Sequence, residues 1–227
     1  MFPLAPADYD AIRLSVKVAV TATVVSLPVG FAVAYLMTYL KFRGKVFFEV
    51  IITLPLTLPP VVIGYFLLLL LGKKGTLGPL LELVGIRLIF TWKAAVVASA
   101  VVGFPLLVRS IRIGMESIDQ QLIRASRTLG APWYDALFTI ILPLSFRGIV
   151  AGSSLMFARS LGEFGATIIV AGNIPGVTQT IPLAIYEYVS SPTSESMAMS
   201  LCVVSVTISL LVLLLHEVLG RKLTKRL

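Results

Sequence analysis

The chain has few of the residues from which disulfides and metal sites are built. It contains one cysteine, Cys202, and one histidine, His216, among 227 residues. A single cysteine cannot form a disulfide within the chain, and a single histidine cannot supply a histidine-based metal or catalytic cluster. We therefore interpret Cys202 as a small packing residue, and we expect no catalytic residue and no metal ligand in this chain.

Charged side chains are also scarce. They make up 13% of the residues, whereas hydrophobic residues make up 57%, which is too apolar for an ordinary soluble domain of this length. Three long stretches, 18–40, 50–71 and 197–215, contain no charged side chain at all. Because roughly 20 apolar residues cross a bilayer as a helix, these stretches predict an all-α integral membrane protein.

Two less regular stretches bring the expected number of membrane spans to about five. The spans are predicted at about 14–40, 48–71, 90–108, 148–171 and 197–217, within one membrane domain covering 12–219. Several contain proline, which removes a backbone donor and favours a kink. These prolines are Pro28, Pro55, Pro59, Pro60 and Pro105.

The distribution of lysine and arginine predicts the orientation in the membrane. Twelve basic residues belong to one set of loops and the carboxyl end: Lys41, Arg43, Lys45, Arg109, Arg112, Arg124, Arg127, Arg147, Arg221, Lys222, Lys225 and Arg226. Six belong to the opposite set: Arg13, Lys17, Lys73, Lys74, Arg87 and Lys93. Because basic residues near span ends are retained in the cytoplasm, we expect an outside amino terminus and a cytoplasmic carboxyl terminus. The segment 109–147 and a basic tail, 220–227, would then be cytoplasmic. The basic residues flank apolar runs and form no single patch, which gives no indication of nucleic-acid binding.

The segment 109–147 has the pattern of two short helices joined by a sharp turn. Ser117 and Gln120 have the spacing of a capping box, so we expect a helix to begin there. Apolar and small residues recur at helical spacing up to Gly130, which would end the helix, and Pro132 would open the next one. This helical hairpin leads into the fourth span, and it is where we expect a soluble partner to bind.

The same hairpin carries a recognisable motif. The residues Arg124-Ala-Ser, three further residues, Gly130, nine residues, and Ile140-x-Leu-Pro143 keep the full spacing of the signature EAA, three residues, G, nine residues, I-x-L-P. The chain therefore resembles the permease subunits of ABC importers, although Arg124 and Ser126 replace the usual Glu and Ala. The resemblance implies a type-1 permease fold with a cytoplasmic coupling helix that sits in a cleft of an ATPase subunit. The coupling residues would be Leu122, Arg124, Ala125, Ser126, Leu129, Gly130, Ile140, Leu142 and Pro143.

The chain has no phosphate-binding loop of the form G-x-x-x-x-G-K-[ST]. We therefore expect no cofactor on this chain and no enzymatic activity of its own. ATP and Mg would be bound by a separate ATPase subunit, which would supply the energy.

Three further segments, 54–64, 157–166 and 173–182, resemble molybdate permeases within this family. Sulfate and thiosulfate permeases share a version of the Arg-x-x-Gly-Glu stretch, so sulfate, thiosulfate or tungstate remain alternative substrates. The resemblance implies a homodimer in the bacterial cytoplasmic membrane, with an ATPase dimer and a periplasmic or lipid-anchored molybdate-binding protein. A rival from another class is an ATP-independent channel or secondary carrier, which would have no need of the coupling segment.

Two charges of opposite sign lie inside the fourth predicted span. Arg159 and Glu163 are four residues apart, which places them on one face of a helix. Charges at membrane depth are costly and face protein or water, so the pair is a candidate site. We favour a structural ion pair that neutralises itself, and we keep as the alternative that Arg159 and Glu163 line the translocation path, with Arg159 meeting the oxyanion.

Overall fold

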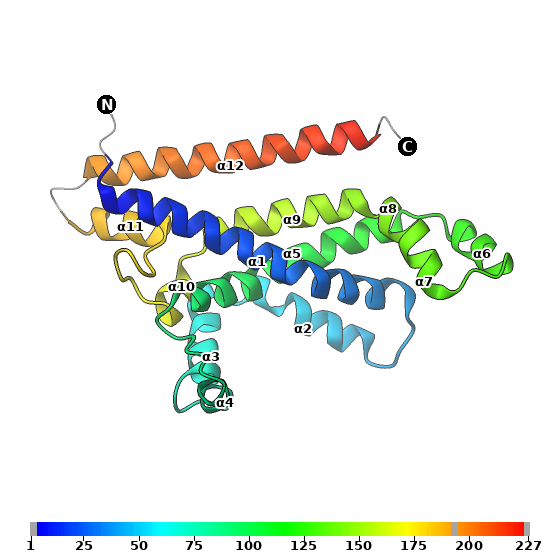
Figure 1. Ribbon diagram of the computed structural model, residues 1–227, viewed down its shortest axis with the longest axis horizontal. Coiled ribbons are helices and arrows are strands. Elements are labelled where there is room, and N and C mark those ends of the chain that lie inside the picture. Colours follow the sequence, from blue (N-terminus) through cyan, green and yellow to red (C-terminus); the bar gives the residue numbers. More distant parts are fainter. Residues whose placement is uncertain (1–3, 192–194, 225–227) are drawn as a thin grey trace.

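The computed structural model describes residues 4–191 and 195–224, and the regular elements in this part of the chain are helices. In chain order they are α1 (Pro6–Tyr39), α2 (Lys45–Thr57), α3 (Pro60–Leu71), α4 (Gly78–Leu83), α5 (Trp92–Glu116), α6 (Gln120–Thr128), α7 (Trp133–Ala136), the π-helical turn η1 (Leu137–Ile141), α8 (Leu142–Leu144), α9 (Phe146–Leu161), α10 (Gly165–Val170), α11 (Ile181–Val189) and α12 (Glu195–Thr224) (Figure 1). The expectation of an all-α fold is confirmed.

Three helices in the described part of the chain are long and apolar enough to cross a membrane: α1, α5 and α12. Two further spans are possible if bent helix pairs are each taken as one. The first pair is α2 with α3, bent by 113°, and the second is the segment from Trp133 to Leu144 with α9, bent by 63°. Three to five spans agree with an integral membrane protein of about five spans.

The bend between α2 and α3 lies inside the predicted second span, 48–71, where prolines favour an irregular helix. Pro59 precedes α3 and Pro60 is its first residue, so neither has a backbone N–H with which to continue α2. The chain therefore breaks rather than kinks, and α3 packs against α10 and leads away from α1 and α2 toward α4 (Figure 1). Pro28 and Pro105, by contrast, remain inside α1 and α5 without ending them.

The helix boundaries do not coincide with those of the predicted segments. Helix α5 continues through residues 109–116, the first part of the segment expected to be cytoplasmic, and Arg112 pairs with Glu116 one turn further along the same helix. The fourth predicted span, 148–171, is divided into α9 and α10. Helix α12 runs through the first part of the predicted basic tail, and residues 225–227 of that tail lie outside the described residues.

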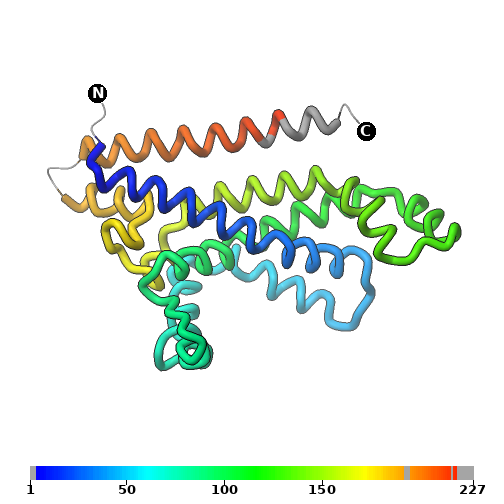
Figure 2. The backbone as a smooth tube through the Cα atoms, in the orientation of Figure 1, coloured from blue at the N-terminus to red at the C-terminus, as the bar shows by residue number. Residues whose placement is uncertain are grey.

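Helix α5 forms the centre of the bundle, packed between α1 and α9, with α12 on the far side of α9 (Figure 2). Small residues allow α5 and α9 to approach closely. A Cβ atom added at Gly148 of α9 would lie 2.9 Å from the Cα of Gly114 on α5 and 2.7 Å from the carbonyl oxygen of Ser110. Such small-residue contacts are typical of helix pairs in membranes, where close backbone approach replaces the hydrophobic effect as the main attraction.

This crossing predicts a position-specific effect of alanine. Gly148→Ala should lower the free energy of unfolding by about 2 kcal/mol, because the methyl group meets backbone atoms that cannot rotate away. The melting temperature of the purified protein should fall by roughly 5 °C. Gly162→Ala is the matched control, since its nearest neighbour would lie at 3.9 Å. Equal melting temperatures for the two variants would contradict the close crossing.

Candidate functional site

The helical hairpin after α5 projects beyond the end of the bundle, on the side where α1 ends and α2 begins (Figure 1). Its first helix, α6, is capped by Asp119, whose Oδ1 accepts a hydrogen bond of 2.8 Å from the backbone N–H of Gln121. The prediction that Ser117 is the cap is wrong. Ser117 instead ends α5, where its hydroxyl donates to the carbonyl oxygen of Gly114. Aspartate two residues later is an equally good cap and leaves α5 free to run to Glu116.

The turn after α6 requires glycine, as predicted. Gly130 has φ +87°, in the left-handed region, and its N–H donates to the carbonyl oxygen of Arg127 at 3.0 Å. The next N–H, of Ala131, donates to the carbonyl oxygen of Ser126, and Pro132 then precedes α7. The predicted helix, turn and second helix are therefore present in this order.

The hairpin exposes apolar side chains at a place remote from the helix bundle. Leu129 is 88% exposed, Trp133 60% and Phe138 65%, and Leu122 is half exposed, whereas Ile123 is the one buried residue of α6. Solvent-exposed aromatic and aliphatic side chains gathered in this way are characteristic of a surface that binds another protein. We define Leu122, Leu129, Trp133, Tyr134 and Phe138 as the hairpin surface. Tyr134 was not singled out from the sequence.

The nine coupling residues predicted from the motif fall into two groups. The first group, from Leu122 to Gly130, lies on α6 and the turn, where Arg124 and Ala125 are exposed and the hydroxyl of Ser126 donates to the carbonyl oxygen of Ile123. The second group connects the hairpin to the spans, because Ile140 and Leu142 pack against the main core while Pro143 is exposed. The motif thus joins an exposed surface to the start of α9.

Arg159 and Glu163 form the ion pair predicted from their spacing. The guanidinium Nη1 of Arg159 lies 2.7 Å from Oε2 of Glu163, and the side chains are 30% and 1% exposed respectively. Glu163 lies beyond the last residue of α9, so the pair closes the end of that helix rather than lying on its face. The other carboxylate oxygen, Oε1, accepts a hydrogen bond of 2.9 Å from the N–H of Ala166 at the start of α10. Glu163 therefore holds the end of α9 and the beginning of α10 together.

The break between α9 and α10 lies against the break between α2 and α3. A Cβ atom at Gly165 would lie 3.0 Å from the Cβ of Pro60, and one at Gly64 would lie 2.8 Å from the carbonyl oxygen of Ala166. Two discontinuous helices thus meet near the buried carboxylate of Glu163. Irregular backbone at membrane depth is tolerated where it is covered by protein or lines a water-filled path, and discontinuous helices line the paths of many transporters.

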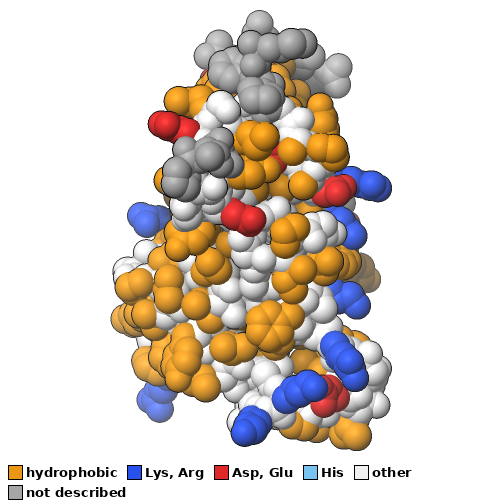
Figure 3. All heavy atoms as spheres, turned by 90° about the vertical axis from the view of Figure 1, so that its left-hand side faces the viewer, with side chains coloured by type: hydrophobic (Ala, Val, Ile, Leu, Met, Phe, Trp, Pro, Cys, Tyr) orange, Lys and Arg blue, Asp and Glu red, His pale blue; other side chains and the backbone are white. Residues whose placement is uncertain are grey.

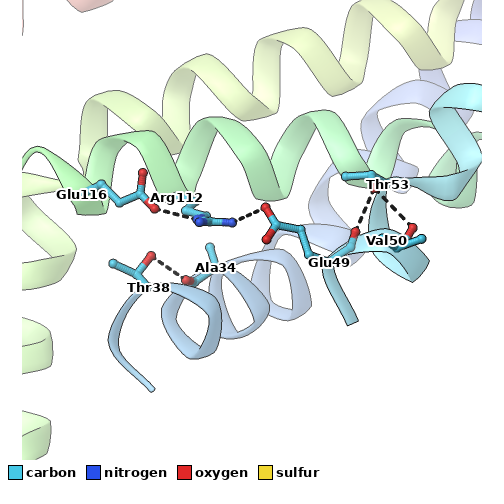
Figure 4. A network of polar contacts seen from close by, with 7 residues as sticks. All are labelled: Ala34, Thr38, Glu49, Val50, Thr53, Arg112 and Glu116. Atoms are coloured by element: carbon cyan, nitrogen blue, oxygen red, sulfur yellow. Dashed lines mark hydrogen bonds and ion pairs between the residues drawn. The ribbon is translucent and has the colours of Figure 1, made fainter. Parts of the chain in front are cut away.

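A second charged group lies nearer the hairpin. Arg112 of α5 lies between two carboxylates, with Nη1 2.6 Å from Oε1 of Glu49 on α2 and Nε 2.6 Å from Oε1 of Glu116 (Figure 4). The group borders a cavity of about 460 Å³ between α1, α2 and α5. The spacing of Arg112 and Glu116 can be read from the sequence, whereas nothing in the sequence indicates Glu49 as a partner.

The opposite end of the molecule holds the loop 172–180 and α11. Seen from that side, hydrophobic side chains are interspersed with uncharged polar side chains and backbone, acidic side chains lie mainly in the upper half, and most basic side chains lie along the right-hand edge and at the bottom (Figure 3). The loop is tied to α11 by Glu187, whose Oε2 accepts hydrogen bonds from the side-chain amides of Asn173 and Gln179.

The phenol of Tyr188 on α11 donates a hydrogen bond to Oδ1 of Asp8 on α1, and burial together with this bond raises the pKa of Tyr188 to about 12. The phenol therefore remains a donor at physiological pH.

Comparison with known proteins gives one family. Residues 26–225 match the family described as binding-protein-dependent transport system inner membrane component. The chain is 48% identical over 221 residues to the molybdenum transport system permease protein ModB of Haemophilus influenzae, covering 97% of this chain and 96% of that protein. It is 46% identical to ModB of Escherichia coli K12, covering 96% of each. The sulfate transport system permease protein CysW of Synechococcus elongatus is 35% identical, covering 94% of this chain and 76% of that one.

Solved structures with a similar fold are ABC transporters. A bacterial ABC transporter involved in the import of the acidic polysaccharide alginate matches with a TM-score of 0.75 at 14% identity, covering 96% of this chain and 80% of that one. The MetNI methionine ABC transporter in an inward-facing conformation matches with a TM-score of 0.69 at 17% identity, covering 96% and 94%. These likenesses confirm the expected type-1 permease fold. With the family match over most of the chain, they show that the protein belongs to the inner membrane components of binding-protein-dependent transport systems.

Proposed function

We propose that this chain is the membrane-spanning permease subunit of an ABC importer that carries molybdate across the cytoplasmic membrane. The observation that carries the proposal is the identity of 46 to 48%, over almost the whole chain, to two permeases named for molybdenum transport. Identity to the sulfate permease is lower, at 35%, and covers less of that protein. The chain performs no covalent chemistry in this scheme, and ATP hydrolysis takes place on a separate subunit.

The hairpin surface supports the coupling part of the proposal. Its exposed apolar side chains, with the basic residues Arg124 and Arg127 beside them, would dock on the ATPase, which binds ATP and Mg. A movement of the docked hairpin has two routes into the spans. It reaches α5 through the short connection before α6, and it reaches α9 through η1 and α8. Closure of the ATPase would in this way be transmitted to the centre of the bundle.

The remaining partners follow from the same proposal. The permease acts as a homodimer, as the resemblance to the permease subunits of ABC importers implies. A molybdate-binding protein, periplasmic or lipid-anchored, delivers the anion to the end that carries α11. The amino terminus lies outside and the carboxyl terminus in the cytoplasm. In support of this orientation, the loops with more basic residues lie at the hairpin end of the bundle (Figure 1).

Uptake into vesicles tests the proposal. The permease is reconstituted with its cognate ATPase and binding protein, and entry of labelled molybdate is followed with and without ATP inside the vesicles. We expect ATP-dependent entry that excess tungstate reduces and that sulfate or thiosulfate reduces less. Sulfate entry at a higher rate than molybdate entry would assign the chain to the alternative substrate. Entry that is independent of ATP would instead favour a channel or secondary carrier.

A further inference from the structure

Helix α2 is loosely attached to the rest of the protein. None of its residues is buried, and Val46 and Phe47 are 77% and 71% exposed. Ile52 is the residue of α2 that packs against the main core. A helix of this length normally owes its stability to an apolar face buried against its neighbours, so α2 has little apolar contact to fix its position.

Two cavities separate α2 from its neighbours. The cavity of about 460 Å³ lies between Glu49, Ile52 and Thr53 of α2 and the side of α5 that carries Val108 and Arg112. A second cavity, of about 300 Å³, lies further along the helix and is lined by Ile51, Ile52 and Pro55 together with residues of α1 and α5. Close packing is the rule inside proteins, and cavities of this size mark a contact that can open without breaking many favourable contacts.

The ion pair between Glu49 and Arg112 bridges this gap. Among the described residues it is the one hydrogen bond or ion pair that joins α2 to another helix, and its atoms are 2.6 Å apart (Figure 4). The contact between Arg112 and Glu116 stays within α5 and does not hold α2. One interaction therefore connects an otherwise poorly packed helix to the centre of the bundle.

The chain changes direction sharply at both ends of α2. Gly44, the residue before α2, has φ +87°, and the 113° break at Pro59 and Pro60 follows the helix. Arg112 in turn lies one turn before the end of α5, where the connection to α6 begins. Helix α2 is thus a separate straight segment between two changes of chain direction, and its attachment point lies next to the hairpin.

We propose that α2 is the movable wall of the inner cavity and that the ion pair between Glu49 and Arg112 is the latch that holds it against α5. The inference rests on the proposed transport function and adds to it the element that opens. Movement of the hairpin shifts the end of α5, separates Arg112 from Glu49, and lets α2 swing away. Arg112 is a positioning residue here and does not bind the anion, because its guanidinium is already paired with two carboxylates, those of Glu49 and Glu116.

A reversible crosslink tests the latch. Glu49→Cys and Arg112→Cys are combined with Cys202→Ala, and a reducible bifunctional thiol reagent joins the two cysteines in vesicles containing the assembled transporter. We expect molybdate uptake to be lost on crosslinking and restored by a reductant, because α2 must move away from α5 in each cycle. The matched control pairs Arg112→Cys with Glu116→Cys in the same background. A crosslink there lies within one helix, so uptake should be the same before and after crosslinking of this control variant.

The yield of the first crosslink gives a readout that does not depend on transport. It should fall when the ATPase is trapped with ATP and vanadate, relative to the nucleotide-free state, whereas the yield of the control crosslink should not.

In an otherwise unmodified transporter, Glu49→Gln should raise ATP hydrolysis in the absence of loaded binding protein by about two- to fivefold, as expected when a partly exposed ion pair is lost. Unchanged yield, or full uptake by the crosslinked protein, would overturn the latch. Absence of molybdate uptake by the unmodified transporter would count against the proposed substrate instead, and would leave the yield measurement to decide the latch.

Discussion

Replacing Glu163 with alanine should abolish transport and lower the amount of folded permease in the membrane. The carboxylate is almost completely buried, and its removal leaves the Arg159 guanidinium without its partner and the N–H of Ala166 without its acceptor. Breaking a buried ion pair on one side costs about 3 kcal/mol, because the remaining charge stays in a medium that solvates it poorly. Size-exclusion chromatography of the solubilised, fluorescently tagged permease measures the folded fraction.

Glu163→Gln separates the two roles of this side chain. Glutamine keeps an oxygen that can accept from Ala166 and loses the charge that pairs with Arg159. We expect a folded fraction between those of the wild type and Glu163→Ala. If glutamine is as damaging as alanine, the ion pair is the dominant interaction. If glutamine behaves as the wild type, capping of α10 is dominant.

The structure also changes the result expected when the charges of Arg159 and Glu163 are exchanged. From the spacing alone, a self-neutralised pair should partly tolerate exchange of its two members. Arginine at position 163, however, has no acceptor for the N–H of Ala166, so the double variant Arg159→Glu with Glu163→Arg should not recover. Normal assembly of Arg159→Ala with complete loss of uptake would instead show that Arg159 meets the anion.

The broken helices show which features of the spans can be predicted from the sequence and which cannot. Prolines at 55, 59 and 60 predicted an irregular second span, and the structure confirms it. The size and direction of the break depend on the packing of α3 against α10. In this contact Gly64 of α3 lies against the backbone of Ala166 in α10. A contact between residues so far apart in the chain leaves no periodic signal. For the same reason the sequence placed Arg159 and Glu163 four residues apart but gave no sign that Glu163 also caps the next helix.

The structure of the segment from α6 to α7 was easier to predict from the sequence, because neighbouring residues determine it. Gly130 and Pro132 fix the turn through backbone conformation, which adjacent residues decide. The start of the hairpin was predicted two residues early, since Ser117 and Asp119 are both good caps and the choice depends on how far α5 continues. That continuation is stabilised by Arg112, whose partner Glu49 lies 63 positions earlier in the sequence. Local patterns thus predicted the helical hairpin, whereas its link to α2 required the folded chain.

Valine at position 130 should uncouple the permease from its ATPase while the spans remain inserted. Gly130 has φ +87°, where a β-branched side chain is strained at a cost on the order of 1 to 3 kcal/mol. The turn would relax to a different backbone path and displace Leu122 and Leu129 relative to Trp133, so the hairpin surface would no longer match its partner. We expect loss of co-purifying ATPase, or a retained ATPase that loaded binding protein no longer stimulates.

Substitutions that differ only in backbone preference make this test specific. No atom lies within 4 Å of a Cβ built at Gly130, so size alone should not matter there. Asparagine tolerates the left-handed region better than other non-glycine residues, so Gly130→Asn should keep most of the docking and of the stimulated hydrolysis. Gly130→Ala should fall between asparagine and valine. This order, measured as co-purified ATPase and as stimulated hydrolysis in liposomes, is expected only if the turn conformation positions the coupling surface. Equal behaviour of asparagine and valine would mean that this surface is not the site of ATPase docking.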